Sequence, residues 1–430
     1  MIGPLTQYFA EGASGFFHTA IGLLNASDTA NAQVSVWLYP EDATPVEILM
    51  TLPPLGRHTL DLDTVVANAA GVSALITSDR PIAATRQMIW GEPVFGSTLE
   101  SGIPNTSATW YFAEGATGGF SLFYLIQNPG PSPATVTLTH LLEGGAAPVV
   151  QQVVVPPRSR HTVAVNEVPA LANASMSTAI TSDVPIVAER AMYISGPRLF
   201  EGGAASRGAT SVQPTWSFAE GATGFFHTYL LLGNPNADVA SVTVRYLLPG
   251  GAAIVKAYDV PGRARRTIDV NGEDAQLAST AVAMTVLSTR PIVAERAMWW
   301  GEPAWHEGSA SLGSVETGYL WAIGEGAEGG PSSESTFVLV ANASSIAGTV
   351  TVTVCYDDGT RQQRDYAIAG DARLTVRIGD DFAQSRNQRF SVLVESVTNG
   401  MPITVDVSRY QSADAFLGAG GAASATRIVR

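Results

Sequence analysis

The sequence predicts an all-β protein made of four tandem β-sandwich domains of about seven strands each. Three observations lead to this fold class. A motif recurs four times, short runs of alternating apolar and polar residues fill each copy, and turn residues separate the runs. The motif reads QYFAEGASG from Gln7, WYFAEGATG from Trp110, WSFAEGATG from Trp216 and WAIGEGAEG from Trp321. Its period of about 105 residues is the length of a whole domain.

A second motif closes each copy. It reads RPIAATRQMIWG from Arg80, VPIVAERAMYISG from Val184, RPIVAERAMWWG from Arg290 and, more loosely, MPITVDVSRYQ from Met401. We therefore predict domains at residues 1–105, 106–212, 213–316 and 317–430, the last being divergent. A unit of this size can bury its own core, so we expect four autonomous domains that follow one another as a rod.

The second copy illustrates the predicted strands. Its alternating runs are WYFAEG, FSLFYLIQN, TVTLTHLLEG, VVQQVVVP, HTVAVNEV, SMSTAITS and PIVAERAMYI. Glycine-rich turns such as EGGAAP from Glu143, PGGAA from Pro249 and DDGT from Asp357 join neighbouring runs as hairpins. Seven short strands with turns between them are typical of a β-sandwich.

Composition excludes several classes of function. The formal net charge of −14, with Lys256 as the single lysine, argues against a nucleic-acid surface. The chain has no apolar run long enough for membrane insertion. Cys355 is the only cysteine, which rules out an internal disulfide and a thiolate metal cluster. The first motif follows Met1 almost at once, so we expect no signal peptide in this chain and a longer natural precursor.

The strings WYFAEGATG, YLIQNPG with its following ATVTL run, and VPIVAERAMY resemble the tandem immunoglobulin-like repeats of large bacterial surface and secreted proteins. The resemblance covers nearly the whole chain and is weakest in the fourth copy, where Gly324 replaces the motif alanine. It implies immunoglobulin-like domains at the cell surface or outside the cell, serving as a structural or adhesive spacer. It implies no enzymatic activity, no catalytic residues and no cofactor.

Two other functions stay open at this point. The chain could be a multivalent carbohydrate-binding module, or the subunit of a surface filament or layer joined through sheet edges. The corresponding partners are adjacent repeats, other copies of the same chain, a surface polysaccharide or a protein.

Each copy directs one glutamate and one arginine toward its core or the rim of its core. The glutamate shares a strand face with the motif aromatic residue, and the arginine shares a face with the apolar residues of the closing strand. An unpaired buried charge costs several kcal/mol, so we expect each glutamate to pair with the arginine of its own copy. The expected pairs are Glu11 with Arg86, Glu114 with Arg190, Glu220 with Arg296 and Glu325 with Arg409.

A second arginine recurs at Arg57, Arg160, Arg265 and Arg373. Alternation places it opposite the apolar face of its strand, so we predict a solvated position. The alternative is a row of charges that meets the acidic surface of a neighbouring repeat.

The histidines and acidic pairs give no consistent metal site. His18 and His227 align with serines in the other copies, and a metal-ligand set would keep its identity between copies. His306 beside Glu307 supplies only two adjacent groups, which do not make a site. We therefore predict no bound metal.

Large aromatic residues follow each closing strand. Rings in these positions could stack on sugars or pack against the next repeat, and we favour packing because the connectors are short. The candidate residues are Phe95, Phe200, Trp305 and Phe416 on the loops, with Trp299 and Trp300 nearby.

Overall fold

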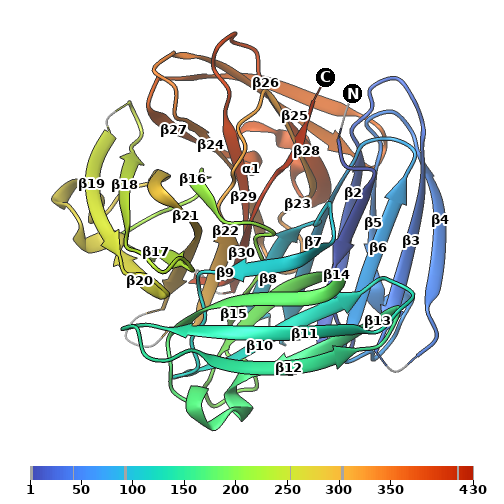
Figure 1. Ribbon diagram of the computed structural model, residues 1–430. Coiled ribbons are helices and arrows are strands. Elements are labelled where there is room, and N and C mark those ends of the chain that lie inside the picture. Colours follow the sequence, from blue (N-terminus) through green and yellow to red (C-terminus); the bar gives the residue numbers. More distant parts are fainter. Residues whose placement is uncertain are drawn as a thin grey trace.

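The computed structural model describes residues 3–41, 43–91, 94–251, 253–301, 305–413 and 416–429. Over these residues the chain consists mainly of β-strands (Figure 1), in agreement with the predicted all-β class. No helix within these ranges is long and apolar enough to cross a membrane. The helical segments are α1 (Ile378–Asp381) and the 3-10 turns η1 (Leu62–Thr64), η2 (Val165–Glu167), η3 (Pro169–Leu171), η4 (Val270–Gly272), η5 (Ala275–Leu277) and η6 (Ala383–Ser385).

The strands of the second copy follow the alternating runs predicted for it, except that the last two runs form one strand, and the first copy has its strands in the same order. Those of the first copy are β1 (Thr6–Phe9), β2 (Phe17–Asn25), β3 (Ala32–Pro40), β4 (Val46–Leu52), β5 (Arg57–Asp61), β6 (Val72–Ser78), β7 (Ile82–Trp90) and β8 (Gly96–Ser101). Those of the second are β9 (Ser107–Phe112), β10 (Phe120–Asn128), β11 (Ala134–Leu142), β12 (Val149–Val155), β13 (Ser159–Ala164), β14 (Met176–Ile194) and β15 (Gly203–Arg207).

The third and fourth copies repeat the same order. The strands of the third copy are β16 (Gln213–Phe218), β17 (His227–Asn234), β18 (Ala240–Leu247), β19 (Ala253–Val260), β20 (Ala264–Asp269), β21 (Ala283–Trp300) and β22 (Glu307–Leu312). Those of the fourth are β23 (Leu320–Glu328), β24 (Glu334–Asn342), β25 (Gly348–Tyr356), β26 (Arg361–Ile368), β27 (Ala372–Arg377), β28 (Gln388–Ser396), β29 (Thr404–Ala413), β30 (Phe416–Ser424) and β31 (Thr426–Ile428).

Each copy forms two sheets that enclose its core. In the first copy the strand orders are β1-β6-β3-β4 and β5-β2-β7-β8, and Val36 and Ile76 of one sheet share a buried cluster with Ile21 and Ile82 of the other. Strand β3 buries alternate residues, as its period-two pattern predicts. Among the described residues, all strand pairings join strands of the same copy.

The strand order differs from that of an immunoglobulin domain, in which the first strand lies beside the second and the last beside the sixth. Here β1 pairs with β6, and β7 pairs with β2. The reason is visible in the second copy, where the sixth and seventh predicted strands form one continuous strand, β14, that crosses from one sheet to the other. Without a turn between them, these two segments cannot fold back on each other as a hairpin.

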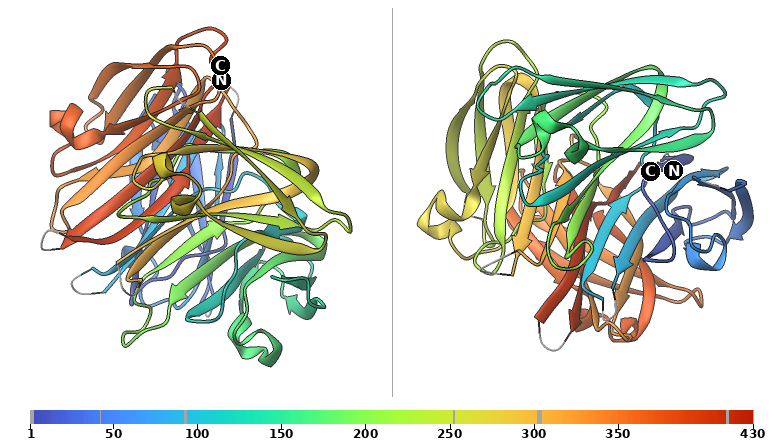
Figure 2. Two further views of the ribbon diagram at one scale, coloured as in Figure 1. Left: turned by 90° about the vertical axis from the view of Figure 1, so that its left-hand side faces the viewer. Right: turned by 90° about the horizontal axis from the view of Figure 1, so that it is seen from below.

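The four copies are arranged as a closed ring, so the expected rod is wrong. Strands β8, β15, β22 and β30 lie side by side around a central axis, with β8 next to both β15 and β30 and with β22 next to the same two strands. The two ends of the chain meet on one side of the ring (Figure 2), where Gly3 lies against Ile428. Each copy therefore contacts a neighbour on both sides.

Candidate functional site

The junction between the first and second copies is built on a buried ion pair. Arg86 Nη1 lies 2.6 Å from Glu189 Oε2, and both side chains are completely buried. The same guanidinium donates to the main-chain oxygen of Glu11 at 2.8 Å. Glu189 Oε1 in turn accepts the N–H of Ala10 at 2.8 Å. One carboxylate of the second copy thus holds both the opening and the closing strand regions of the first.

The junction between the second and third copies repeats this pattern. Glu295 pairs with Arg190 and accepts the N–H of Ala113 at 2.9 Å. Arg190 also donates to the main-chain oxygen of Glu114 at 2.8 Å. The two junctions are therefore equivalent.

The junction between the third and fourth copies carries a shorter acid. The position of Glu189 and Glu295 is occupied by Asp406, whose Oδ2 accepts the N–H groups of Ala219 and Glu220 at 2.9 and 2.8 Å. Among the described residues, Asp406 Oδ1 and all three guanidinium nitrogens of Arg296 lack a hydrogen-bond partner. Aspartate keeps the contacts to the main chain, but it is one methylene too short for the contact to arginine that the longer acids make.

The ring closes where the fourth copy meets the first. The N–H of Gly324 donates to Thr85 Oγ1 at 3.0 Å, so a hydroxyl of the first copy takes the role of the acid. Arg57 Nη2 lies 2.9 Å from Glu325 Oε2, with both side chains completely buried. Thr59 Oγ1 donates to the same oxygen at 2.8 Å.

The second recurring arginine is buried at these junctions, and the prediction of a solvated position is wrong. Arg160 Nε donates to the main-chain oxygen of Ala10 at 2.9 Å, and Arg265 Nη1 donates to that of Gly115 at 2.8 Å. Arg373 Nη1 donates to the main-chain oxygen of Gly221 at 2.7 Å. Alternation placed these side chains correctly on the face away from their own core, but the preceding copy covers that face. The alternative interpretation, a charge row that meets the neighbouring repeat, matches the contacts.

The expected pairing within each copy is present in two copies. Glu114 lies 3.2 Å from Arg190 and Glu325 lies 3.4 Å from Arg409, which also pairs with Glu334 at 2.7 Å. In the other two copies the motif glutamate pairs with the second arginine of the next copy. These pairs are Glu11 with Arg160 at 3.8 Å and Glu220 with Arg373 at 3.3 Å.

Burial and ion pairing shift the pKa values of the buried glutamates and arginines in opposite directions. Burial raises the pKa of the Glu11 carboxyl, against the opposing charges of Arg160 and Arg86. Burial alone would lower the pKa of the Arg86 guanidinium, but Glu189 and Glu11 together outweigh it and the pKa is raised. The Arg86 guanidinium therefore keeps its charge in this buried pair.

One carboxylate lies among all four copies. Glu307, at the start of β22, is completely buried, and its Oε1 accepts the N–H groups of Gly203 and Gly308 at 2.6 and 2.9 Å. Its Oε2 accepts the N–H of Ser97 at 2.9 Å, and the N–H of Gly420 is directed to the same carboxylate. These four donors belong to β8, β15, β22 and β30 and occupy equivalent positions in the four copies.

Sequence reasoning missed the role of Glu307, although a signal was present. The equivalent positions in the other copies are Gly96, Gly202 and Ala419, within runs of small residues. A lone acid in such a run indicates a carboxyl group that is needed in one place only. Burial raises the pKa of Glu307 well above its usual range, although the surrounding N–H groups lower it.

A cavity opens on the ring axis at the end where the two chain termini meet. We call it the axial funnel. Its volume is about 630 Å³, within the range of small-molecule sites. Connecting segments from all four copies line it, namely residues 3–6, 102–105, 207–211, 312–316 and 425–427, together with Trp110, Trp216 and Trp321.

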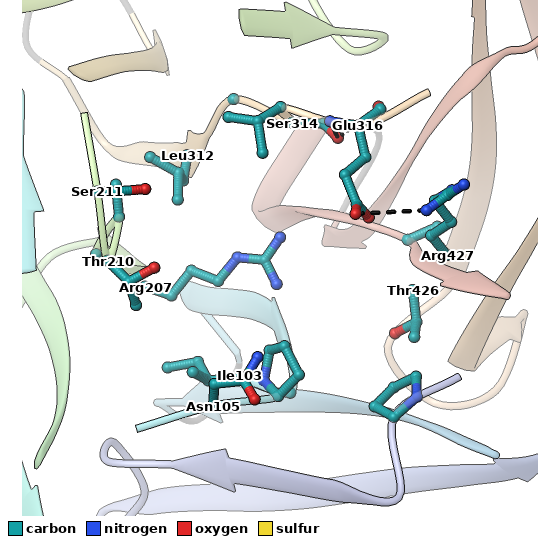
Figure 3. A pocket seen from close by; sticks show the side chains of 18 of the residues that line it. Ile103, Asn105, Arg207, Thr210, Ser211, Leu312, Ser314, Glu316, Thr426 and Arg427 are labelled. Atoms are coloured by element: carbon teal, nitrogen blue, oxygen red, sulfur yellow. Dashed lines mark hydrogen bonds and ion pairs between the residues drawn. The ribbon is translucent and has the colours of Figure 1, made fainter. Parts of the chain in front are cut away.

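The charged side chains of the funnel are Arg207, Glu316 and Arg427. Glu316 and Arg427 pair at 3.4 Å, whereas Arg207 extends toward the middle of the cavity (Figure 3). The main-chain N–H of Arg207 donates to the buried Glu100 Oε2 at 2.8 Å, which fixes the base of this side chain. No ion pair of the Arg207 guanidinium is present among the described residues.

The predicted aromatic residues lie mostly between copies. Trp90 Nε1 donates to the main-chain oxygen of Phe200 at 2.7 Å, and the Arg198 guanidinium lies 4.7 Å from the ring centre of Phe95. Each of these contacts joins the first copy to the second. They agree with packing between repeats and leave these rings unsuited to stacking on a sugar.

Two of the remaining aromatic candidates, Trp299 and Trp300, also lie at junctions. Trp299 packs against Phe120 across the second junction, and their ring centres are 5.0 Å apart. Across the third junction, the ring centres of Trp300 and Tyr410 are 5.9 Å apart. The ring of Trp305 packs against that of His227 in its own copy, with ring centres 4.8 Å apart. The side chain of Phe416 lies outside the described residues.

Within the described parts of the chain, no group of three or more histidine, cysteine, aspartate or glutamate side chains could hold a metal ion. His306 is exposed and Glu307 is buried, so these neighbours do not act together. Burial raises the pKa of the Cys355 thiol to about 11, which keeps it protonated.

Comparison with known proteins gives no family. No protein-family model and no curated protein matches the chain. Among solved structures, Thermotoga maritima 1070 is 20% identical over 24% of this chain and 95% of its own, with a TM-score of 0.23. The Anabaena sensory rhodopsin transducer is 26% identical over 20% of this chain and 94% of its own, with a TM-score of 0.18. A tetra-tandem repeat from the extending region of a large adhesion protein is 10% identical over 95% of this chain and 99% of its own, with a TM-score of 0.11. At these TM-scores the likeness carries no argument about function.

Proposed function

We propose that this chain is a non-catalytic binding module of the bacterial cell surface, in which four β-sandwich repeats close into one ring and share a single binding site, the axial funnel. The observation that carries the proposal is that connecting segments of all four copies line one cavity of about 630 Å³. A site at the meeting point of several units, concave and of this size, is a common location for ligands.

A non-catalytic role is supported by what the buried ionisable groups do. Glu189 and Glu295 are engaged with an arginine and a main-chain N–H of the preceding copy, and Glu307 is engaged with main-chain N–H groups. Groups held in this way stabilise the ring and are not free to exchange protons with a substrate.

The spacer function expected from the sequence is less well supported than binding. A spacer separates its two ends, whereas Gly3 and Ile428 lie against each other. A module whose two ends lie side by side is suited to act as a binding domain attached to another part of a surface protein. The loop aromatic residues Phe95 and Phe200 pack between copies, so we place the binding site in the funnel and not on those rings.

A glycan array tests this function. We compare the wild-type chain with a Thr210→Trp variant, because Thr210 lines the funnel and is exposed, so a large ring there fills the cavity without entering a core. The proposal predicts array ligands whose binding is lost in the variant. Binding that is identical in both proteins would contradict it.

A further inference from the structure

Most of the arginines at the junctions bind a neighbouring copy, whereas Arg207 lies at the axial funnel. Arg86, Arg160 and Arg265 each bind a carboxylate or a main-chain oxygen of a neighbouring copy. Arg427 at the mouth of the funnel is paired with Glu316. The Arg207 guanidinium has no ion pair among the described residues and reaches into the cavity (Figure 3), although its positive charge also acts to lower the pKa of the buried Glu100.

The position of Arg207 breaks the fourfold repetition. The equivalent residues in the other copies are Ser101, Leu312 and Ser424. Ser101 Oγ donates to the main-chain oxygen of Ser424 at 2.5 Å, and Leu312 is apolar and buried, so Arg207 is the charged residue among these four equivalent positions. A repeat that is kept only for packing has no need for one cation at this place in an otherwise acidic chain.

The wall around Arg207 offers short polar groups and small apolar faces. Thr210, Ser211 and Asn105 line the cavity close to the solvent, and the Asn105 amide has no side-chain partner among the described residues. Pro104 and Ile103 supply apolar surface on the same wall. Hydroxyl and amide groups next to apolar faces suit a ligand that carries several hydroxyl groups on a ring.

We propose that the axial funnel binds an acidic sugar, with the carboxylate of a uronic acid residue on the guanidinium of Arg207 and the sugar hydroxyls on the polar wall. The planar guanidinium presents two parallel N–H donors, which match a carboxylate. The lining holds two arginines and one glutamate, so its formal charge is positive in a chain whose net charge is −14. This contrast favours an anion at the funnel over binding elsewhere on the surface.

The inference rests on the proposed function, since it names the ligand class of the same site. The test uses calorimetric titration of the full chain with glucuronate and with glucose, which share a ring and differ at the carboxylate. We expect glucuronate to bind more tightly than glucose, and an Arg207→Gln variant to weaken glucuronate roughly tenfold or more. Arg80→Gln is the matched control, because Arg80 is exposed and its guanidinium donates to the main-chain oxygen of the neighbouring Asp79.

Two further variants separate the possible failures. Asn105→Ala should weaken both sugars, and Thr210→Trp should abolish both. If glucuronate and glucose bind alike and Thr210→Trp abolishes both, the acidic ligand is wrong while the funnel remains a binding site. If a short peptide binds through its terminal carboxylate and glucuronate does not bind, the assignment of an acidic sugar as the ligand is also wrong. If Thr210→Trp changes no binding in titration or on the glycan array, the proposed function fails as well.

Discussion

The guanidinium of Arg86 lies 2.6 Å from the carboxylate of Glu189, and this pair joins two repeats that are adjacent in the chain. The next junction repeats the pair with Arg190 and Glu295. Both pairs are completely buried, where an ion pair is costly to break from one side because the remaining charge is left without a partner. The ring is therefore held by contacts that a set of independent domains on a string would lack.

Replacing Arg86 by methionine should destabilise the protein strongly. The change leaves Glu189 as an unpaired buried charge, so we expect the free energy of unfolding to fall by about 3–5 kcal/mol. Urea unfolding followed by tryptophan fluorescence measures it. The control is Arg80→Met on the exposed end of the same motif, which should change stability by less than about 0.5 kcal/mol. Equal effects of the two substitutions would show that the Arg86 pair does not hold the junction.

Replacing Asp406 by glutamate should stabilise the protein. The added methylene lets the carboxylate reach Arg296 as Glu189 reaches Arg86, which supplies a partner to a buried guanidinium that lacks one among the described residues. A hydrogen bond to a charged group contributes about 1.5–3 kcal/mol, and we expect a gain of that order in the free energy of unfolding. Denaturant unfolding of the two proteins measures it.

The same substitution in an Arg296→Met background is the control. There the longer acid finds no cation, so the gain should disappear. A gain of the same size in both backgrounds would mean that the extra methylene acts through packing and not through the pair.

Replacing Glu307 by glutamine should make stability less dependent on pH. Burial raises the pKa of Glu307 in the folded protein above that of an unfolded glutamate, about 4.3, so the folded state holds the proton more tightly. The contribution of Glu307 to stability is then largest below that unfolded pKa and is lost as the pH rises through the folded pKa. Each unit between the two pKa values corresponds to roughly 1.4 kcal/mol.

The measurement is the difference in free energy of unfolding between wild type and Glu307→Gln at acidic, intermediate and alkaline pH. Other carboxylates titrate in both proteins and cancel in the difference. We expect the wild type to lose stability relative to the variant as the pH rises from about 4.5 to 8. A difference that grows in favour of the wild type over this range would show that the four N–H donors outweigh burial.

Much of each sandwich could be predicted from the sequence, because alternation and turn residues are local signals. The run FSLFYLIQN matches β10, and VVQQVVVP matches β12 within one residue. The eighth strand was missed, since β15 is a run of small residues, GAASR, without the β-branched or aromatic side chains that mark strands. Its pairing depends on the closing strand β14 and on the neighbours around the axis.

The closure of the ring could not be predicted in the same way. The face that carries Arg57 and Arg160 was identified correctly as the one away from the core, but alternation within a strand does not tell whether water or another copy covers a face. The motif glutamates and closing arginines were identified as buried charges. Their partners were assigned only within a copy, because nothing in one strand indicates that a side chain reaches across a junction.

The most direct test of the ring is the radius of gyration of the whole chain, measured by small-angle X-ray scattering at low concentration. A compact particle of this length should give about 22 Å. Four sandwiches in line, each roughly 35 Å long, would give about 40 Å. A value near the first figure is the result that a closed ring of four repeats predicts, and a value near the second would contradict it.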